Sequence, residues 1–212
     1  MDFFAPATCF KENTCLCENN PSLVGFINPV SIVTSLAFIF VGIYLLSKKT
    51  DIDFSRFLGI MNIAMGIVTI YLHMHLNFLG DVLDFSMVII FLVLPELYLM
   101  FHKKKLHLYS TIALLFLTLI TFLTIYNDLR KYLAGIVLLI IIFINIVVRR
   151  NLLKMRMIFL MLFFGIFIWA LDDSHLIACN PTSIFQLHAL FHIVMAMVSL
   201  RAYEYYVKII PN

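Results

Sequence analysis

The sequence predicts an all-α integral membrane protein, a bundle of seven transmembrane helices in one domain that spans residues 1–212. Composition, the spacing of apolar stretches and the placement of basic residues support this prediction. Hydrophobic residues make up 63% of the chain and charged residues 13%, whereas soluble domains are about 45–50% apolar. A chain of 212 residues cannot bury so much apolar surface in one aqueous core. Lipid must therefore solvate part of it.

Apolar stretches long enough to cross a bilayer as a helix, about 20 residues, recur along the chain. They lack the period-two alternation of a β-barrel, and open sheet edges are not viable in lipid. A polar N-terminal segment, residues 1–28, precedes them and lacks the basic start and apolar run of a signal peptide. The predicted spans are Pro29–Leu46, Phe57–Phe78, Val82–Phe101, Leu108–Ile125, Tyr132–Val148, Met157–Leu171 and Ser183–Val207.

Lysine and arginine accumulate in alternate loops, which predicts the orientation of the bundle. The loops on one side hold only Lys11, Arg130 and Lys131. Because cytoplasmic loops are enriched in basic residues, the N-terminus is expected outside the cytoplasm and the C-terminus inside. The net charge of +3 comes from these loops and does not indicate a nucleic-acid partner. The basic residues of the predicted cytoplasmic side are Lys48, Lys49, Arg56, Lys103, Lys104, Lys105, Arg149, Arg150, Lys154, Arg156 and Lys208.

Histidines inside the spans predict a metal site, because ionisable groups within a membrane mark function by default. His188 and His192 are spaced i, i+4 on the seventh span, so they share one helix face. The predicted topology places His73 of the second span at the same depth, in the outer leaflet, whereas His75 points elsewhere. Three imidazoles favour zinc, although copper, iron and nickel also accept them. The alternative is that such histidines only form interhelical hydrogen bonds.

Further polar residues are expected near the histidines. Thr69 precedes His73 by one helical turn, and Asp84 begins the third span at a similar depth. Catalytic zinc sites keep an open ligand position, and the ion lowers the pKa of a bound water to about 7. Asp84 would accept the proton of that water, and Thr69 would hydrogen-bond the oxyanion that forms when a carbonyl is attacked. Asp172, at the outer end of span six, would either hydrogen-bond a ligand histidine or mark the membrane boundary.

These residues follow a family pattern. The chain resembles the alkaline ceramidases, within the superfamily of seven-helix membrane hydrolases that includes the adiponectin receptors. The family reads Ser-x3-His-x10-Asp across spans two and three and His-x3-His in span seven. Thr69, His73, Asp84, His188 and His192 keep both spacings. The segments LHMHLNFLGDVLDFSM and FQLHALFHIVMAMVSLRAY also resemble the family. Spans four and five match it only as apolar helices.

The resemblance implies a zinc-dependent hydrolase that cleaves ceramide-like lipids within the membrane to a sphingoid base and a fatty acid. Its zinc ligands would be His73, His188 and His192, and its catalytic carboxylate Asp84. Threonine stands at position 69 in place of the family serine, which keeps the hydroxyl and adds a methyl group. The active site would face the lumenal or periplasmic leaflet. A lipid esterase of the phospholipase kind and a receptor or scaffold with a structural metal remain alternatives, because fold alone does not decide function.

The resemblance also implies a calcium site in the N-terminal segment. Glu18 and Asn20 match two of the family's ligands, and Asn28 falls where a third carboxylate is usual. Cys15 occupies the position of the aspartate that opens the family's site. Calcium prefers several oxygen ligands, most of them charged. A single remaining carboxylate predicts a weak or absent site, and the alternative is that these residues cap a solvated loop.

All four cysteines, Cys9, Cys15, Cys17 and Cys179, fall on the predicted outer side. An oxidising compartment permits disulfides there, and four cysteines allow three pairings. The family resemblance aligns Cys17 with Cys179, which would join the N-terminal segment to the loop before the seventh span.

Peptide mapping without reduction tests this pairing. Protein prepared from an oxidising compartment is expected to yield a linked pair of peptides that contain Cys17 and Cys179, because both thiols face the same compartment. Recovery of both thiols in free form would rule the disulfide out.

Overall fold

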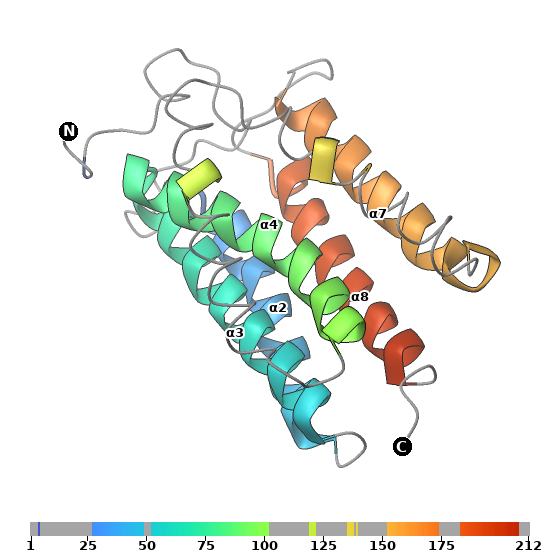
Figure 1. Cartoon of the computed structure of the whole chain (residues 1–212). Helices are drawn as coiled ribbons and strands as arrows, with labels where there is room; N and C mark the ends of the chain where they lie inside the picture. Colours follow the sequence, from blue (N-terminus) through green and yellow to red (C-terminus); the bar gives the residue numbers. More distant parts are fainter. Residues whose placement is uncertain are drawn as a thin grey trace. The chain divides into compact units, whose positions relative to one another are not determined.

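A computed structural model of the chain describes Phe4 and residues 27–48, 52–101, 119–121, 135–137, 139, 152–173 and 183–207. Within these ranges the long elements are all helices (Figure 1), which confirms the all-α prediction for this part of the chain. They are α2 (Pro29–Ser47), α3 (Ile52–His75), α4 (Phe78–Phe101), α7 (Leu152–Asp173) and α8 (Leu187–Val207).

The chain divides into two compact units. The first comprises residues 1–80 and 156–212, and the second comprises residues 81–155. Helices α2, α3 and α8 and most of α7 therefore belong to the first unit, and most of α4 belongs to the second. In the predicted fourth and fifth spans the described residues, 119–121, 135–137 and 139, are helical. The rest of both spans lies outside the described residues.

The first predicted span agrees with α2, which begins at Pro29 as expected. Proline suits the first helical position because the missing N–H has no intrahelical partner there. Helix α7 is longer than predicted at both ends, and α8 begins at Leu187 rather than at Ser183.

The predicted end of the second span at Phe78 is wrong. Helix α3 ends at His75, and Leu76 takes a positive φ of 41°, which leaves the helical conformation. The Asn77 side chain then caps the next helix, since its Oδ1 accepts the Gly80 N–H at 2.8 Å. An asparagine three residues before the N–H that it accepts is a standard helix start. Phe78 is therefore the first residue of α4.

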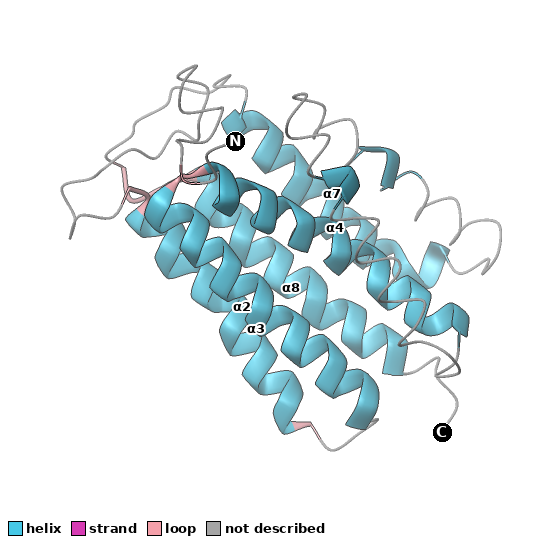
Figure 2. Ribbon diagram, turned by 60° about the vertical axis from the view of Figure 1, so that its left-hand side comes forward, coloured by secondary structure: helices cyan, strands magenta, loops and turns pink. Residues whose placement is uncertain are grey.

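Glycines set the closeness of α2 and α3, which lie side by side in both ribbon views (Figure 1 and Figure 2). A Cβ atom at Gly42 would lie 2.7 Å from the Gly59 carbonyl oxygen and 2.7 Å from Cγ1 of Ile63. A Cβ at Gly66 would lie 2.6 Å from Cγ1 of Ile39. Small residues at such contacts allow helix backbones to approach each other closely.

Helix α8 completes the packing of the first unit. The amide of Asn62 on α3 donates to Ser199 Oγ on α8 at 2.8 Å. The Phe54 ring lies between Tyr203 and Tyr206, with centroid separations of 6.4 Å and 5.6 Å. These contacts join α3 to α8 at two points, and α8 also packs against α2.

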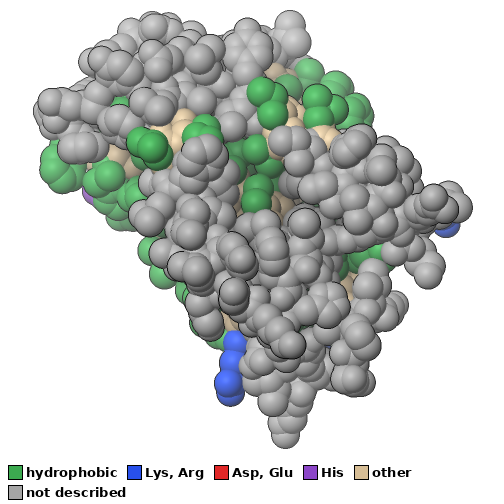
Figure 3. All heavy atoms as spheres, in the orientation of Figure 1, with side chains coloured by type: hydrophobic (Ala, Val, Ile, Leu, Met, Phe, Trp, Pro, Cys, Tyr) green, Lys and Arg blue, Asp and Glu red, His purple; other side chains and the backbone are tan. Residues whose placement is uncertain are grey.

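Two helices of the described part, α2 and residues Phe54–His75 of α3, are long and apolar enough to cross a membrane. Large apolar side chains also point outward from the first unit. They include Val33 and Phe40 on α2 and Leu160 and Phe163 on α7. The coloured side chains on the face shown in Figure 3 are likewise mostly hydrophobic. Such a surface suits lipid better than water.

The close contact of α2 with α3 yields a stability prediction. Gly42→Ala is expected to lower the free energy of unfolding by about 1–3 kcal/mol, since the new methyl group meets backbone atoms of α3. Gly135→Ala is the control, because a Cβ there meets nothing within 4 Å. It is expected to leave stability unchanged or to raise it. Thermal unfolding in detergent measures both, and equal effects of the two substitutions would contradict the packing.

Candidate metal centre

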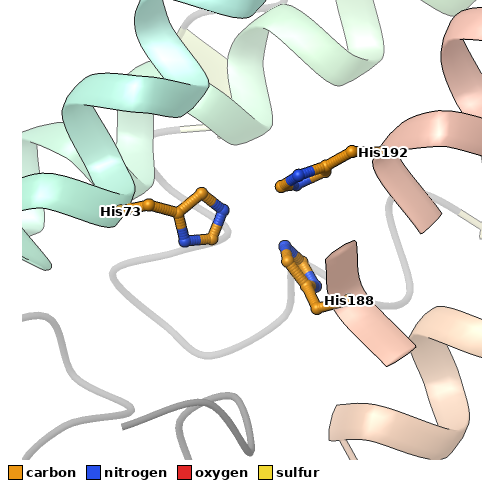
Figure 4. Close-up of side chains that lie close together, drawn as sticks. All are labelled: His73, His188 and His192. Atoms are coloured by element: carbon orange, nitrogen blue, oxygen red, sulfur yellow. The ribbon is translucent and has the colours of Figure 1, made fainter. Parts of the chain in front are cut away.

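Two helix ends bring three histidines together. His73 lies in the last turn of α3, and His188 and His192 lie in the first two turns of α8. Their side chains are buried, with exposures of 0%, 7% and 2%. Figure 4 shows the three rings pointing toward one another. One nitrogen from each ring can be chosen so that all three lie within 4.8 Å of one another. The predicted convergence of these histidines is therefore confirmed.

The geometry of the rings suits a single cation. The centroid of His73 lies 5.0 Å from that of His188 and 5.0 Å from that of His192, and the two α8 rings are 4.6 Å apart. A tetrahedral zinc with bonds of about 2.0–2.1 Å requires ligand nitrogens about 3.4 Å apart. The ligand nitrogens of the three rings, within 4.8 Å of one another, lie close to that range.

Unpartnered nitrogens test the fit independently. Nε2 of His73 and Nδ1 of His188 are buried and have no hydrogen-bond partner among the described residues. A buried polar atom without a partner costs about 1–3 kcal/mol. A cation bound by these rings would remove part of that cost, and imidazole nitrogen is a good ligand for zinc, copper, iron and nickel. The residues present therefore fit a transition-metal ion, whose identity the donor set leaves open.

Helix α2 holds the far side of the His192 ring. Nδ1 of His192 lies 3.2 Å from the Ser31 carbonyl oxygen, 3.2 Å from Ser35 Oγ and 3.3 Å from Thr34 Oγ1. The sequence prediction missed these contacts. The only signal for them was a group of hydroxyl side chains within one turn of an otherwise apolar span.

The residue before α2 holds His73 in two places. The backbone N–H of Asn28 donates to the carbonyl oxygen of His73 at 3.2 Å. The side-chain Nδ2 of Asn28 lies 3.4 Å from Nδ1 of the same histidine. Asn28 itself is fully buried. The start of α2, the end of α3 and the start of α8 consequently meet at one end of the first unit.

The two predicted catalytic residues, Thr69 and Asp84, lie in different units of the chain. Thr69 is buried on α3, one turn before His73 and on the same helix face. Asp84 lies in the second turn of α4 and is half-buried. It belongs to the second unit, which is described separately from the histidines. The roles of both residues stay predictions.

Of the remaining residues that the sequence singled out, the structure describes some, and others lie outside the described part of the chain. His75 ends α3, is exposed and packs its ring against Tyr71 at 4.9 Å, apart from the histidine group. Asp172 is buried in the last turn of α7. The other members of the predicted calcium site and disulfide lie outside the described residues, and both sites stay predictions. These members are Glu18, Asn20, Cys17 and Cys179.

Comparison with known proteins gave no relative: no protein-family model, no curated protein and no solved structure matches the chain.

Metal binding provides a direct check on the histidine group. The purified chain is expected to bind about one transition-metal ion, and a chelator should lower its midpoint of thermal unfolding, since a ligand of the folded state stabilises that state. His73→Ala should abolish both the bound metal and the chelator effect. His75→Ala, two residues away, should keep both. Equal metal content in the two variants would exclude His73 as a ligand.

Proposed function

We propose that the chain is a zinc-dependent intramembrane hydrolase that cleaves the amide bond of ceramide-like lipids. One observation carries the proposal, namely the buried group formed by His73, His188 and His192. Among the described residues this group has three ligating side chains. Three protein ligands are typical of catalytic zinc sites, whereas structural sites are closed by a fourth.

The remaining chemistry is assigned to residues of the chain. Zinc in this site would supply Lewis acidity and a nucleophilic water at neutral pH. In the proposed reaction, water attacks the carbonyl carbon and Asp84 accepts the proton that the water loses. The Thr69 hydroxyl donates to the developing oxyanion. Asp84 then delivers the proton to the amide nitrogen as the C–N bond breaks, which yields a fatty acid and an amine.

The surroundings of the histidines support a lipid substrate. The rings lie at one end of long apolar helices, one of which, α2, exposes Val33, Phe40 and Ile43. We propose that seven such spans cross the bilayer, that the N-terminus lies outside the cytoplasm, and that the site opens toward the extracytoplasmic leaflet. A substrate whose amide lies near the membrane surface would then reach the histidines without leaving the lipid.

Hydrolysis of a fluorescent ceramide analogue tests the proposal. Asp84→Asn is expected to keep its zinc, because the three rings are unchanged, and to lose about a hundredfold or more in turnover, the usual loss for a general base. Thr69→Ala should lose less, and Thr69→Ser should be tolerated because it keeps the hydroxyl. Asp81→Asn, which changes a carboxylate in the preceding turn of α4, is the control and should remain active.

Three outcomes would contradict the assignment. Full activity of Asp84→Asn would show that this carboxylate is not the base. If the unmodified protein cleaves lipid esters instead of amides, the site belongs to a phospholipase-like enzyme. If it cleaves neither over a wide pH range, the metal serves a receptor or scaffold.

A further inference from the structure

The first two turns of α2 carry a polar face that the proposed reaction does not use. Asn28, Ser31 and Ser35 are each 0% exposed. Their spacing of i, i+3 and i+7 places them on one side of the chain as it enters and forms the helix. Buried polar groups in an apolar bundle are costly unless they find partners. Here the Asn28 amide lies beside the His73 ring, and the Ser35 hydroxyl and the Ser31 backbone carbonyl lie beside the His192 ring.

The hydrogen-bond partners of His192 indicate which of its ring nitrogens carries the hydrogen. The Ser35 hydroxyl donates to the Ser31 carbonyl oxygen at 2.6 Å. The Thr34 hydroxyl has two carbonyl acceptors, Val30 and Ser31, each at 3.1 Å. Each hydroxyl gives its hydrogen to a carbonyl oxygen and can therefore accept a hydrogen bond from Nδ1 of His192. The Ser31 carbonyl oxygen beside this nitrogen is an acceptor too. Because the Ser31 carbonyl oxygen can only accept, its contact with Nδ1 is a hydrogen bond when this nitrogen carries the hydrogen. In the neutral ring, Nε2 then keeps its lone pair for a metal.

The same logic applies to His73. Within the part of the chain that the structure describes, Nε2 is its buried nitrogen without a hydrogen-bond partner, so Nε2 is the atom available to a metal. Nδ1 must then carry the hydrogen and needs an acceptor. The Asn28 amide lies beside it, with Nδ2 3.4 Å away. Rotation of the amide by 180° presents Oδ1 in the same place, because the two ends of an amide are nearly equal in size. The backbone bond from Asn28 to the His73 carbonyl holds the pair in register.

We propose that Asn28 and Ser35, together with the Ser31 carbonyl, are positioning groups of the metal centre. They hold Nδ1–H of His73 and His192, so that Nε2 of both rings faces the ion. The inference rests on the proposed metal centre but not on the lipid chemistry. It also gives Asn28 a role other than the calcium ligation that the family resemblance implied. Groups that orient metal-bound histidines are typically worth 10–100-fold in metal affinity.

Zinc affinity of the full-length protein in detergent, measured by competition with a chromophoric chelator, tests this role. Asn28→Leu is expected to weaken zinc binding by about 10–100-fold, because Nδ1–H of His73 loses its acceptor. Asn28→Asp is expected to restore it to the native level or better, because a carboxylate oxygen accepts the same hydrogen bond.

The matched pair Ser35→Ala and Ser55→Ala separates positioning from packing. Both serines are fully buried and both donate to a backbone carbonyl, but Ser55 bonds to Leu45 at the opposite end of α2. Ser35→Ala should weaken zinc by about fivefold, the usual effect of one hydrogen bond, and Ser55→Ala should not.

Proton spectra of the cobalt-loaded protein give a readout that packing alone would not change. The ring N–H signals of ligand histidines are shifted far from the others by the paramagnetic ion. One of them should exchange faster with water in Asn28→Leu and return to its native rate in Asn28→Asp.

Several results would overturn the inference. Native zinc affinity in Asn28→Leu and Ser35→Ala would overturn it and leave the proposed hydrolase intact. Equal losses of zinc affinity in Asn28→Leu and Asn28→Asp would show that Asn28 contributes only to packing. If Asn28→Leu does not fold, a tenfold loss of zinc affinity in Asn28→Asp would still contradict the positioning role of Asn28. Conversely, a protein that shows the expected zinc dependence and cleaves no lipid would refute the proposed function alone.

Discussion

The burial of three imidazole rings at one point is the constraint on which the rest of the first unit depends. Each ring has two polar nitrogens, and an apolar bundle offers them few partners. On one side, α2 supplies acceptors to His192, and Asn28, the residue before α2, places its amide beside His73. On the other side, the rings face one another and could share one cation. The ends of α2, α3 and α8 must therefore meet, and the glycine contacts between α2 and α3 allow that approach.

This arrangement places the proposed chemistry on rigid elements. All three ligands lie within helices, and two of them are spaced one turn apart on α8, so their separation is set by backbone geometry. Thr69 lies one turn from His73 on α3 and shares that rigidity. A site built on helices holds its groups more accurately than one built on loops. Along the chain, the break at Leu76 and Asn77 ends α3 before α4 begins, the helix that carries Asp84.

Spacing and topology were sufficient to predict the histidine group. The i, i+4 pair fixes a helix face, and the alternation of basic loops brings His73 to the depth of that pair. The end of α3 was missed because Leu76 and Phe78 continue the apolar run past His75, and the capping role of Asn77 marks the boundary. The polar face of α2 was missed for a different reason. Serine and threonine often bond to carbonyls of their own helix, so Ser31 and Ser35 look unremarkable until tertiary contacts are known.

The central claim is that His73, His188 and His192 hold one metal ion. Anomalous scattering from crystals of metal-replete protein, recorded on both sides of the zinc absorption edge, tests it most directly. The account predicts one strong peak among the three rings, about 2.0–2.1 Å from a nitrogen of each. Absence of a peak among these rings at the zinc edge and at the edges of copper, iron and nickel would contradict it.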